Sequence, residues 1–293
     1  MKISFDFHLH SRHSCDTRKG SLEELANLAA ASGITQLGFS DHLHTPYNLP
    51  DLASSRQEYL SLPSFSSLKL YFGCELSCVS QWELAEIAAG KVKDPVYGIR
   101  EGGPPGGQMA LGLGEEEIKQ LGLQYIIGGV HWMLYEPLTP EQAIRSYHRQ
   151  YLFLACHPLV DIIAHPWWWQ GAWMDSDHCY RSYPWFDNFR RIPISLHQEF
   201  IMAVKENRKK VEVNISAMLL NPRYPESFKR QYLEYLSFLR QQAVFLTIGS
   251  DFHGFYNPLA IERASKILEG AGFKGEDFWQ LEFVGLDKNN GLS

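Results

Sequence analysis

The chain has 293 residues, of which 45% are hydrophobic and 20% charged, and a net charge of -6. This length and composition suffice for a full hydrophobic core, and α/β barrels of this size often form one domain. The acidic balance excludes a polybasic membrane patch and disfavours nucleic acid as a partner, although a local basic groove would still permit nucleic-acid binding.

The five cysteines form no evident disulfide framework and include no Cys-x-x-Cys pair, as is typical of reduced thiols. The N-terminus does not have the charged region and apolar stretch of a signal peptide. No run approaches the length of apolar sequence that a membrane span requires. We therefore expect a cytoplasmic protein without a membrane partner. Its oligomeric state is left open by the sequence.

Residues 3–10 show the alternating apolar and polar pattern of a β-strand, with apolar side chains at alternate positions from Ile3 to Phe7. The run ends in His8 and His10. On extended backbone, residues i and i+2 point to the same side, so two imidazoles come within reach of one metal ion. A single His-x-His motif is equally compatible with ordinary strand-end histidines.

Six further apolar runs are predicted to be strands, and helical patterns separate them. The predicted strands cover residues 34–39, 68–72, 124–127, 160–164, 211–215 and 244–248. The predicted helices cover residues 21–33, 115–121, 140–155, 196–207, 225–242 and 258–270, and residues 45–66 are expected to be loop with a short helix. Alternation of this kind is typical of parallel strands with right-handed crossovers. Closure into an α/β fold of seven strands, a (β/α)7 TIM-like barrel, is the economical arrangement.

Two segments interrupt the alternation. Residues 91–114 are rich in glycine and proline and are expected to form a surface excursion. Residues 166–193 combine many aromatic residues with arginines and are expected to form a lid or wall over the cavity, or to pack against the barrel or a second subunit. We expect both segments to belong to a single domain of residues 1–293.

Histidine or carboxylate residues end six of the seven predicted strands. These residues are His8, His10, His42, Glu75, His131, His165, Asp251 and His253. The ends of parallel barrel strands converge at one face, so these side chains are expected to surround one cavity. Imidazole and carboxylate donors without thiolate suit Zn, Mn or Fe. The repetition therefore predicts a cluster of divalent metal ions.

The same residues resemble the successive motifs of the PHP (polymerase and histidinol phosphatase) superfamily. The motifs are His8-Leu9-His10, Asp41-His42, Glu75, His131, His165-Pro166 and Asp251-Phe252-His253. The resemblance spans residues 5–253 and implies a distorted seven-stranded barrel with a trinuclear metal site. It implies three ligand sets, namely His8, His10, Glu75 and Asp251; Glu75, His131 and His165; and His42, His253 and Asp16. If Asp16 is only a turn residue, the site holds two ions.

Metal ions a few ångströms apart lower the pKa of a bridging water and take up charge on a phosphoryl group. The resemblance is greatest to histidinol-phosphate phosphatases, so we predict hydrolysis of a small phosphate monoester by a metal-bridged hydroxide. Asp251, His253 and Glu75 are the predicted catalytic residues. The predicted substrate contacts are His13, Arg181, Arg190, Arg191 and Asn214. Two alternatives stay open, a phosphodiesterase or exonuclease that acts on nucleotides and a non-catalytic metal-binding module.

Overall fold

Seven parallel strands form a nearly closed barrel, as the sequence predicts. The structure is a computed structural model that describes residues 1–91, 93–99, 101–135, 139–168, 185 and 188–281. The barrel strands follow one another in chain order, and each pairs in parallel with the next. They are β1 (Phe5–Asp6), β3 (Gln36–Phe39), β5 (Lys69–Ser80), β7 (Tyr125–Gly129), β8 (Ile162–Ile163), β9 (Lys210–Asn214) and β10 (Phe245–Gly249). The amide of Phe7 donates to the carbonyl of Ile248, 3.2 Å away, and so links the first strand to the last.

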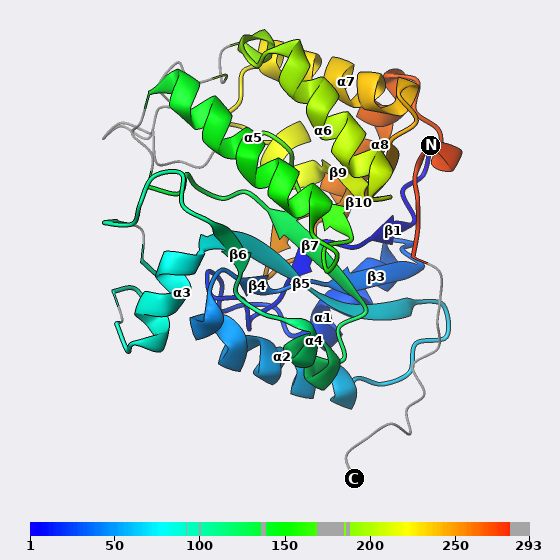
Figure 1. Ribbon diagram of the computed structural model, residues 1–293. Coiled ribbons are helices and arrows are strands. Elements are labelled where there is room, and N and C mark those ends of the chain that lie inside the picture. The colour runs from blue at the N-terminus through cyan, green and yellow to red at the C-terminus, as the bar shows by residue number, and fades with distance from the viewer. Residues whose placement is uncertain (92, 100, 136–138, 169–184, 186–187, 282–293) are drawn as a thin grey trace.

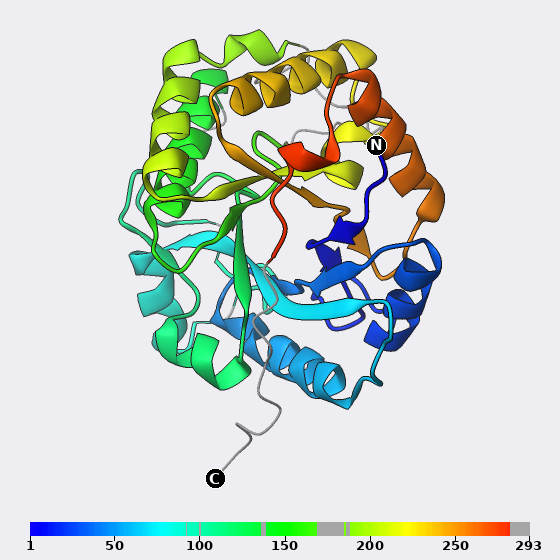
Figure 2. The same cartoon turned by 90° about the vertical axis from the view of Figure 1, so that its right-hand side faces the viewer.

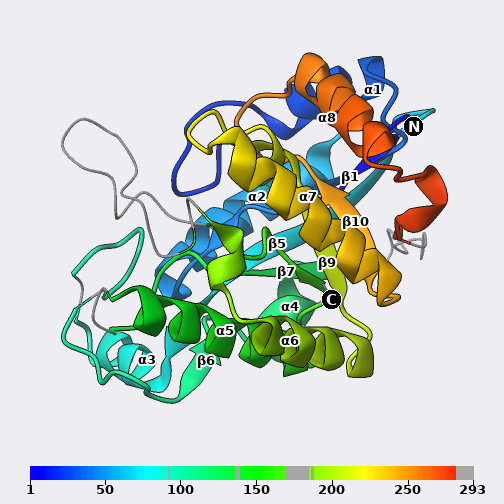
Figure 3. The same ribbon diagram turned by 90° about the horizontal axis from the view of Figure 1, so that it is seen from above.

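Helices surround the strands on the outside (Figures 1, 2 and 3). The α-helices are α1 (Leu22–Ala31), α2 (Leu49–Ser61), α3 (Gln81–Ala88), α4 (Glu115–Leu121), α5 (Pro140–Cys156), α6 (Ile194–Glu206), α7 (Glu226–Gln241) and α8 (Pro258–Gly270). Shorter helical turns are η1 (Pro46–Asn48), η3 (Phe189–Arg191), η4 (Ile215–Leu219) and η5 (Gly275–Asp277). None of the helices in the described part of the chain combines the length and apolar character that a membrane span requires.

Four additional short strands lie beside the barrel path. They are β2 (Leu9–His10), β4 (His42–Leu43), β6 (Met109–Leu111) and β11 (Phe252–His253). Strand β2 pairs with β11 so that His10 lies opposite His253, and β4 pairs with β5 so that His42 lies opposite Glu75. The predicted strand of residues 3–10 is therefore broken in two, because the amide of His8 turns to donate to the Asp6 carboxylate, 3.2 Å away.

Two helical predictions need correction. Residues 45–66 contain a full helix, α2, whose pattern is weak because only Leu52 and Ser55 among its side chains are buried. Helix α3 was not predicted. It begins where Ser80 accepts a hydrogen bond from the amide of Glu83 and so caps the helix N-terminus. Strand β5 extends to Ser80, well beyond the predicted strand of residues 68–72.

The excursion of residues 91–114 also differs from a simple surface loop. Its strand β6 pairs antiparallel with the end of β5. The amide of Ile99 donates to Glu83, 2.7 Å away, and Ile99 is buried. The ring of Tyr97 lies 5.6 Å from the ring of His44. The described part of this segment therefore packs against the barrel near the strand ends.

The barrel interior is closed by aromatic side chains below the strand ends. Tyr125 is buried, and its hydroxyl donates to the carbonyl of Phe7 at 2.8 Å. Gly38 and Gly73 flank this ring, and a Cβ atom at either would come within 2.1 or 2.6 Å of it. Glycine at these two positions thus leaves the space that the tyrosine fills. The polar side chains predicted from the sequence stand above this layer.

Candidate metal centre

Nine side chains from separate elements converge at the carboxyl ends of the barrel strands. They are His8, His10, Asp16, His42, Glu75, His131, His165, Asp251 and His253. Glu75 lies within the long strand β5, and the other eight lie in short strands or in the connections that follow strands. The structure thus brings together every residue that the sequence predicted as a metal ligand.

The first group contains His8, His10, Glu75 and Asp251, all buried, with potential ligand atoms within 4.8 Å of one another. The Nε2 atom of His8 lies 3.1 Å from a Glu75 oxygen, and that of His10 lies 3.2 Å from an Asp251 oxygen. The two Nε2 atoms are 3.0 Å apart. At most one hydrogen can lie between these nitrogens, whereas a cation beside them satisfies both lone pairs.

Glu75 is the central carboxylate of the second group. Its Oε1 atom lies 2.9 Å from Nε2 of His165 and 3.2 Å from Nε2 of His131. Its Oε2 atom faces His8 and also lies 2.9 Å from Nδ1 of His42. Each oxygen therefore faces a different set of imidazoles, as a carboxylate that bridges two cations must.

The third group lies on the solvent side of the centre. An Asp16 oxygen lies 2.9 Å from Nε2 of His253 and 3.3 Å from Nε2 of His42. The rings of His10 and His253 stack at 4.2 Å. The side chains of His253 and Asp16 are 33% and 23% exposed, whereas the members of the first group are sealed from solvent. Asp16 thus occupies a ligand-like position rather than that of a turn residue alone.

The donor set fits divalent cations. Nδ1 of His42 is buried and has no hydrogen-bond partner in the described structure, although a Glu75 oxygen is only 2.9 Å away. Burial alone would raise the pKa of Glu75. Neighbouring His8 and His131 nevertheless hold this pKa well below its ordinary value. Burial lowers the pKa of His131 to about 4. An ionised carboxylate beside a neutral imidazole is the state in which both bind a metal.

Two of the candidate ligands have unusual backbone conformations. Asp251 has a φ of 56° and His165 a φ of 27°, both in a region that L-residues rarely adopt. The amide of Asp251 donates to the carbonyl of His8 at 2.7 Å, and Ser216 donates to the carbonyl of Asp251 at 2.7 Å. Strain of this kind persists where surrounding contacts hold it, and it is concentrated at functional sites.

Comparison with known proteins agrees with this geometry. The sequence profile of the PHP domain family matches residues 6–169, which is more than half of the chain. The chain belongs to the PHP domain family. No curated protein sequence matches it.

Among solved structures, the PHP chain resembles a candidate histidinol phosphatase, HisK, from Listeria monocytogenes. The TM-score is 0.56 at 13% identity, over 90% of this chain and 99% of the other. At this identity the likeness concerns the fold. Ochratoxinase from A. niger has a TM-score of 0.41 at 12% identity, over 93% of this chain and 67% of the other. A Xaa-Pro dipeptidase has a TM-score of 0.38 at 12% identity, over 92% and 70%. The last two similarities are too low to carry an argument.

Glu212 supports the PHP centre and was missed in the sequence. One of its oxygens lies 2.6 Å from Nδ1 of His8, and the other accepts from the amide of His165 at 2.8 Å. A Cβ atom at Gly249 would come within 1.9 Å of Glu212, so glycine there makes room for the carboxylate. The available signal was a glutamate flanked by valines in the predicted strand of residues 211–215. A carboxylate in such a run needs buried partners.

Asn214 belongs to the same network. Its side-chain amide donates to Glu212 at 2.9 Å and to Asp251 at 3.1 Å, and the residue is fully buried. The structure thus places this predicted substrate contact behind the candidate ligands. Together, Glu212 and Asn214 connect three of them, His8, His165 and Asp251.

The other predicted substrate contacts lie in different surroundings. His13 lies 2.5 Å from a carboxylate oxygen of Glu58. Arg190 pairs with Glu234 of α7 at 3.3 Å, and Arg190 and Arg191 are both exposed. Arg181 lies outside the described residues, as does most of the aromatic stretch of residues 166–193.

Three described aromatic residues border the PHP centre. The ring of Trp168 lies 5.2 Å from that of His165 and 5.8 Å from that of His131. The ring of Trp132 lies 5.6 Å from that of His131 and 6.2 Å from that of Tyr97. We call Tyr97, Trp132 and Trp168 the aromatic rim. Trp168 comes from the aromatic stretch that follows the fifth strand, and the other two rings come from other segments. Trp167, Trp185 and Phe189 of the same stretch are buried, which fits the alternative that the stretch packs against the barrel.

His44 lies beside the metal centre and also beside two rings of the aromatic rim, those of Tyr97 and Trp132. Burial, together with neighbouring His42 and His131, holds the pKa of His44 well below its ordinary value. The residue is buried.

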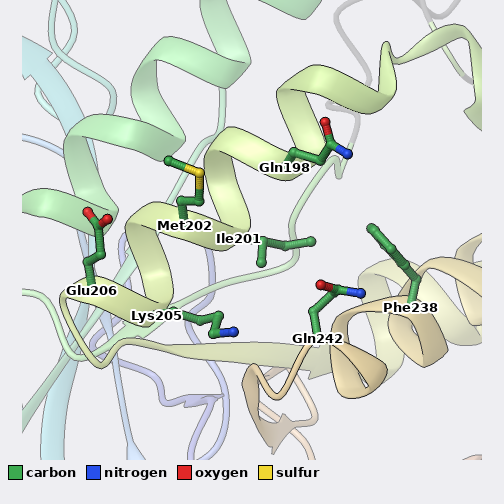
Figure 4. Close-up of a pocket in the computed structure, with 7 residues that line it drawn as sticks. All are labelled: Gln198, Ile201, Met202, Lys205, Glu206, Phe238 and Gln242. Atoms are coloured by element: carbon green, nitrogen blue, oxygen red, sulfur yellow. The ribbon is translucent and has the colours of Figure 1, made fainter.

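A separate pocket lies on the outside of the molecule, between α6 and α7 (Figure 4). Its volume is about 550 Å³, and its lining includes Ile201, Met202 and Phe238. None of its lining residues is a candidate metal ligand, so it plays no part in the chemistry argued for the PHP centre.

Proposed function

We propose that this PHP protein is a metal-dependent phosphatase that hydrolyses a small phosphate monoester. The observation that carries the proposal is the position of Glu75, whose two oxygens face the histidines of two candidate metal groups. Paired cations activate water near neutral pH and neutralise the charge of a phosphoryl group. Such chemistry needs imidazole and carboxylate donors held close together, and this buried set brings both kinds of donor within 4.8 Å of one another in the two groups that contain Glu75.

The residues of this chain have distinct proposed roles. Glu75 joins the two groups, and His8, His10, His131 and His165 complete them. Asp16, His42 and His253 would hold the ion nearest to solvent. This arrangement supports three divalent ions, with two as the minimum, and the donors suit Zn, Mn or Fe.

Asp251 and His253 are the proposed proton-handling residues. An oxygen of Asp251 lies 3.2 Å from His10 and 3.7 Å from His253, at the boundary between the buried groups and the exposed one. A carboxylate here can accept a proton from the attacking water. His253 is part-exposed, so protons can pass between it and solvent or the leaving group.

We also propose that residues 1–293 form one domain. The single strand path from β1 to β10 supports this, since the site takes residues from both ends of the path. A division of the chain into two domains would place His8 and Asp251 in different domains, although their side chains belong to one group of candidate ligands.

The test combines elemental analysis with a substrate panel. Purified protein is stripped with a chelator, reloaded with Zn, Mn or Fe, and assayed with p-nitrophenyl phosphate, its bis-ester and histidinol phosphate. We expect monoester turnover that is lost on stripping and restored by metal. Preference for the bis-ester would assign a phosphodiesterase instead. A fully loaded protein that is inert toward all three esters would contradict the enzymatic proposal.

A further inference from the structure

A serine hydroxyl bridges two histidines at the edge of the centre. Ser77 lies in β5, two residues after Glu75, and is buried. Its Oγ atom lies 2.7 Å from Nδ1 of His131 and 2.8 Å from Nδ1 of His44. The hydroxyl therefore joins a proposed metal ligand to a histidine that was not predicted to be one.

The hydrogens in this bridge follow from its chemistry. A hydroxyl has one hydrogen to donate, so it cannot donate to both rings. His131 turns Nε2 toward Glu75, at 3.2 Å, and a metal ligand must keep the lone pair of that nitrogen free. The hydrogen of His131 is then on Nδ1 and is donated to Ser77. Ser77 in turn donates its own hydrogen to Nδ1 of His44, so the hydrogen of the His44 ring is on Nε2.

This Nε2–H group is available beside the centre. It has no hydrogen-bond partner among the described residues. The ring of His44 lies 4.5 Å from that of His42 and 5.0 Å from that of His131, which belong to the candidate group built on Glu75. The ring of His44 also lies 5.0 Å from that of Trp132 and 5.6 Å from that of Tyr97.

We propose that His44 is a substrate-binding residue whose Nε2–H donates a hydrogen bond to a phosphoryl oxygen of the ester. The leaving group then lies toward Trp132 and Tyr97 of the aromatic rim. The inference rests on the proposed function, because it assumes a phosphoryl group held at the metal centre. An N–H donor suits this place, since it can bind an anionic oxygen held beside the metal centre.

The experiment compares two substitutions of His44 in metal-loaded protein. His44→Phe keeps a ring and removes the donor, whereas His44→Gln keeps an amide N–H near the position of Nε2. Binding of inorganic phosphate is measured by calorimetry, metal content by elemental analysis, and kcat and KM with p-nitrophenyl phosphate. We expect His44→Phe to weaken phosphate binding by about 10- to 100-fold and His44→Gln by less than about fivefold. Metal content is unchanged in both.

His148→Phe is the matched control, because His148 is also a buried histidine but pairs with Glu199 on α6. It is expected to leave phosphate binding and metal content unchanged. Full phosphate affinity in His44→Phe would overturn the inference. Loss of metal in that variant would also overturn it, by making His44 a metal ligand.

A second measurement needs no variant. The ¹⁵N chemical shifts of the histidine side chains in the zinc-loaded protein report which nitrogen of each ring carries hydrogen. We expect His44 to be protonated on Nε2 and His131 on Nδ1, and the opposite tautomer of His44 would refute the inference. If the wild-type protein hydrolyses no ester but binds phosphate through His44, the proposed function fails while the role of His44 in binding the anion stands.

Discussion

Replacing Glu212 with glutamine tests whether the carboxylate behind His8 controls metal binding. The native carboxylate accepts from Nδ1 of His8 at 2.6 Å, which leaves Nε2 of His8 free to face Glu75 and His10. In Glu212→Gln, one oxygen can still accept from the amide of His165. The new NH2 group then faces His8 and favours the tautomer with hydrogen on Nε2, where a metal would bind.

The expected loss can be bounded from carboxylate–histidine–metal arrangements of this kind. Removal of such a partner lowers metal affinity by about 10- to 100-fold, or roughly 1.4 to 2.8 kcal/mol. Chelator competition with zinc gives the affinity directly. Thermal unfolding of the metal-free protein separates this effect from a general loss of stability. We expect the affinity to fall while the unfolding temperature of the metal-free protein changes little.

The control for this prediction is Asp161→Asn. Asp161 is also a carboxylate between neighbouring barrel strands, where it accepts from the amide of Ile126 at 2.9 Å, but it contacts no candidate ligand. It is expected to leave zinc affinity unchanged. The reasoning is refuted if Glu212→Gln binds zinc within about threefold of the wild-type affinity, or if the control loses affinity equally.

Three further predictions concern the same centre. We expect His8→Ala or Asp251→Ala to abolish phosphatase activity while circular dichroism shows a largely intact fold, and full turnover in either would contradict the assignment. We expect Gly249→Ala to destabilise the protein by about 1 to 3 kcal/mol in denaturant unfolding, because its Cβ would meet Glu212 at 1.9 Å; unchanged stability would show that the carboxylate can move aside. In metal-free protein, burial alone would lower the pKa of His42, but Asp16 and Glu75 raise this pKa from 6.5 to about 10. That proton stabilises the fold fully below pH 6.5, and its contribution is lost as the pH rises toward 10, whereas a bound metal replaces it. The difference in unfolding temperature between metal-loaded and metal-free protein should therefore widen from pH 7 to pH 9, and a difference that narrows would be inconsistent with this competition.

The candidate ligands could be predicted because they stand where strands end. His10, His131 and Asp251 each follow a short apolar run, and parallel strands bring such positions to one face. Even Asp16, the least certain of the nine, lies beside two of the predicted histidines. Sequence order and fold topology therefore indicated eight of the nine donors, and Asp16 was predicted only from the resemblance to the PHP superfamily.

The supporting residues could not be found in the same way. Glu212 and Ser77 lie inside strands that are buried on both faces, so alternation no longer indicates which side chains face the site. Their roles depend on partners far away in sequence, such as His8 for Glu212 and His44 for Ser77. A single sequence gives the residue type at such a position and not its neighbours.

The directions in which the candidate ligand side chains point depend most on contacts between residues far apart in the sequence. Asp251 and His165 leave the sheet with positive φ, so the regular strand geometry that predicts neighbouring side-chain directions no longer applies to them. The amide of Asp251 is held by the carbonyl of His8, and the amide of His165 by Glu212. Each strained ligand is thus fixed by a hydrogen bond to a residue on another strand or its end. The geometry of the centre is therefore a property of the closed barrel, because opening it between β10 and β1 would release Asp251 and His8 together.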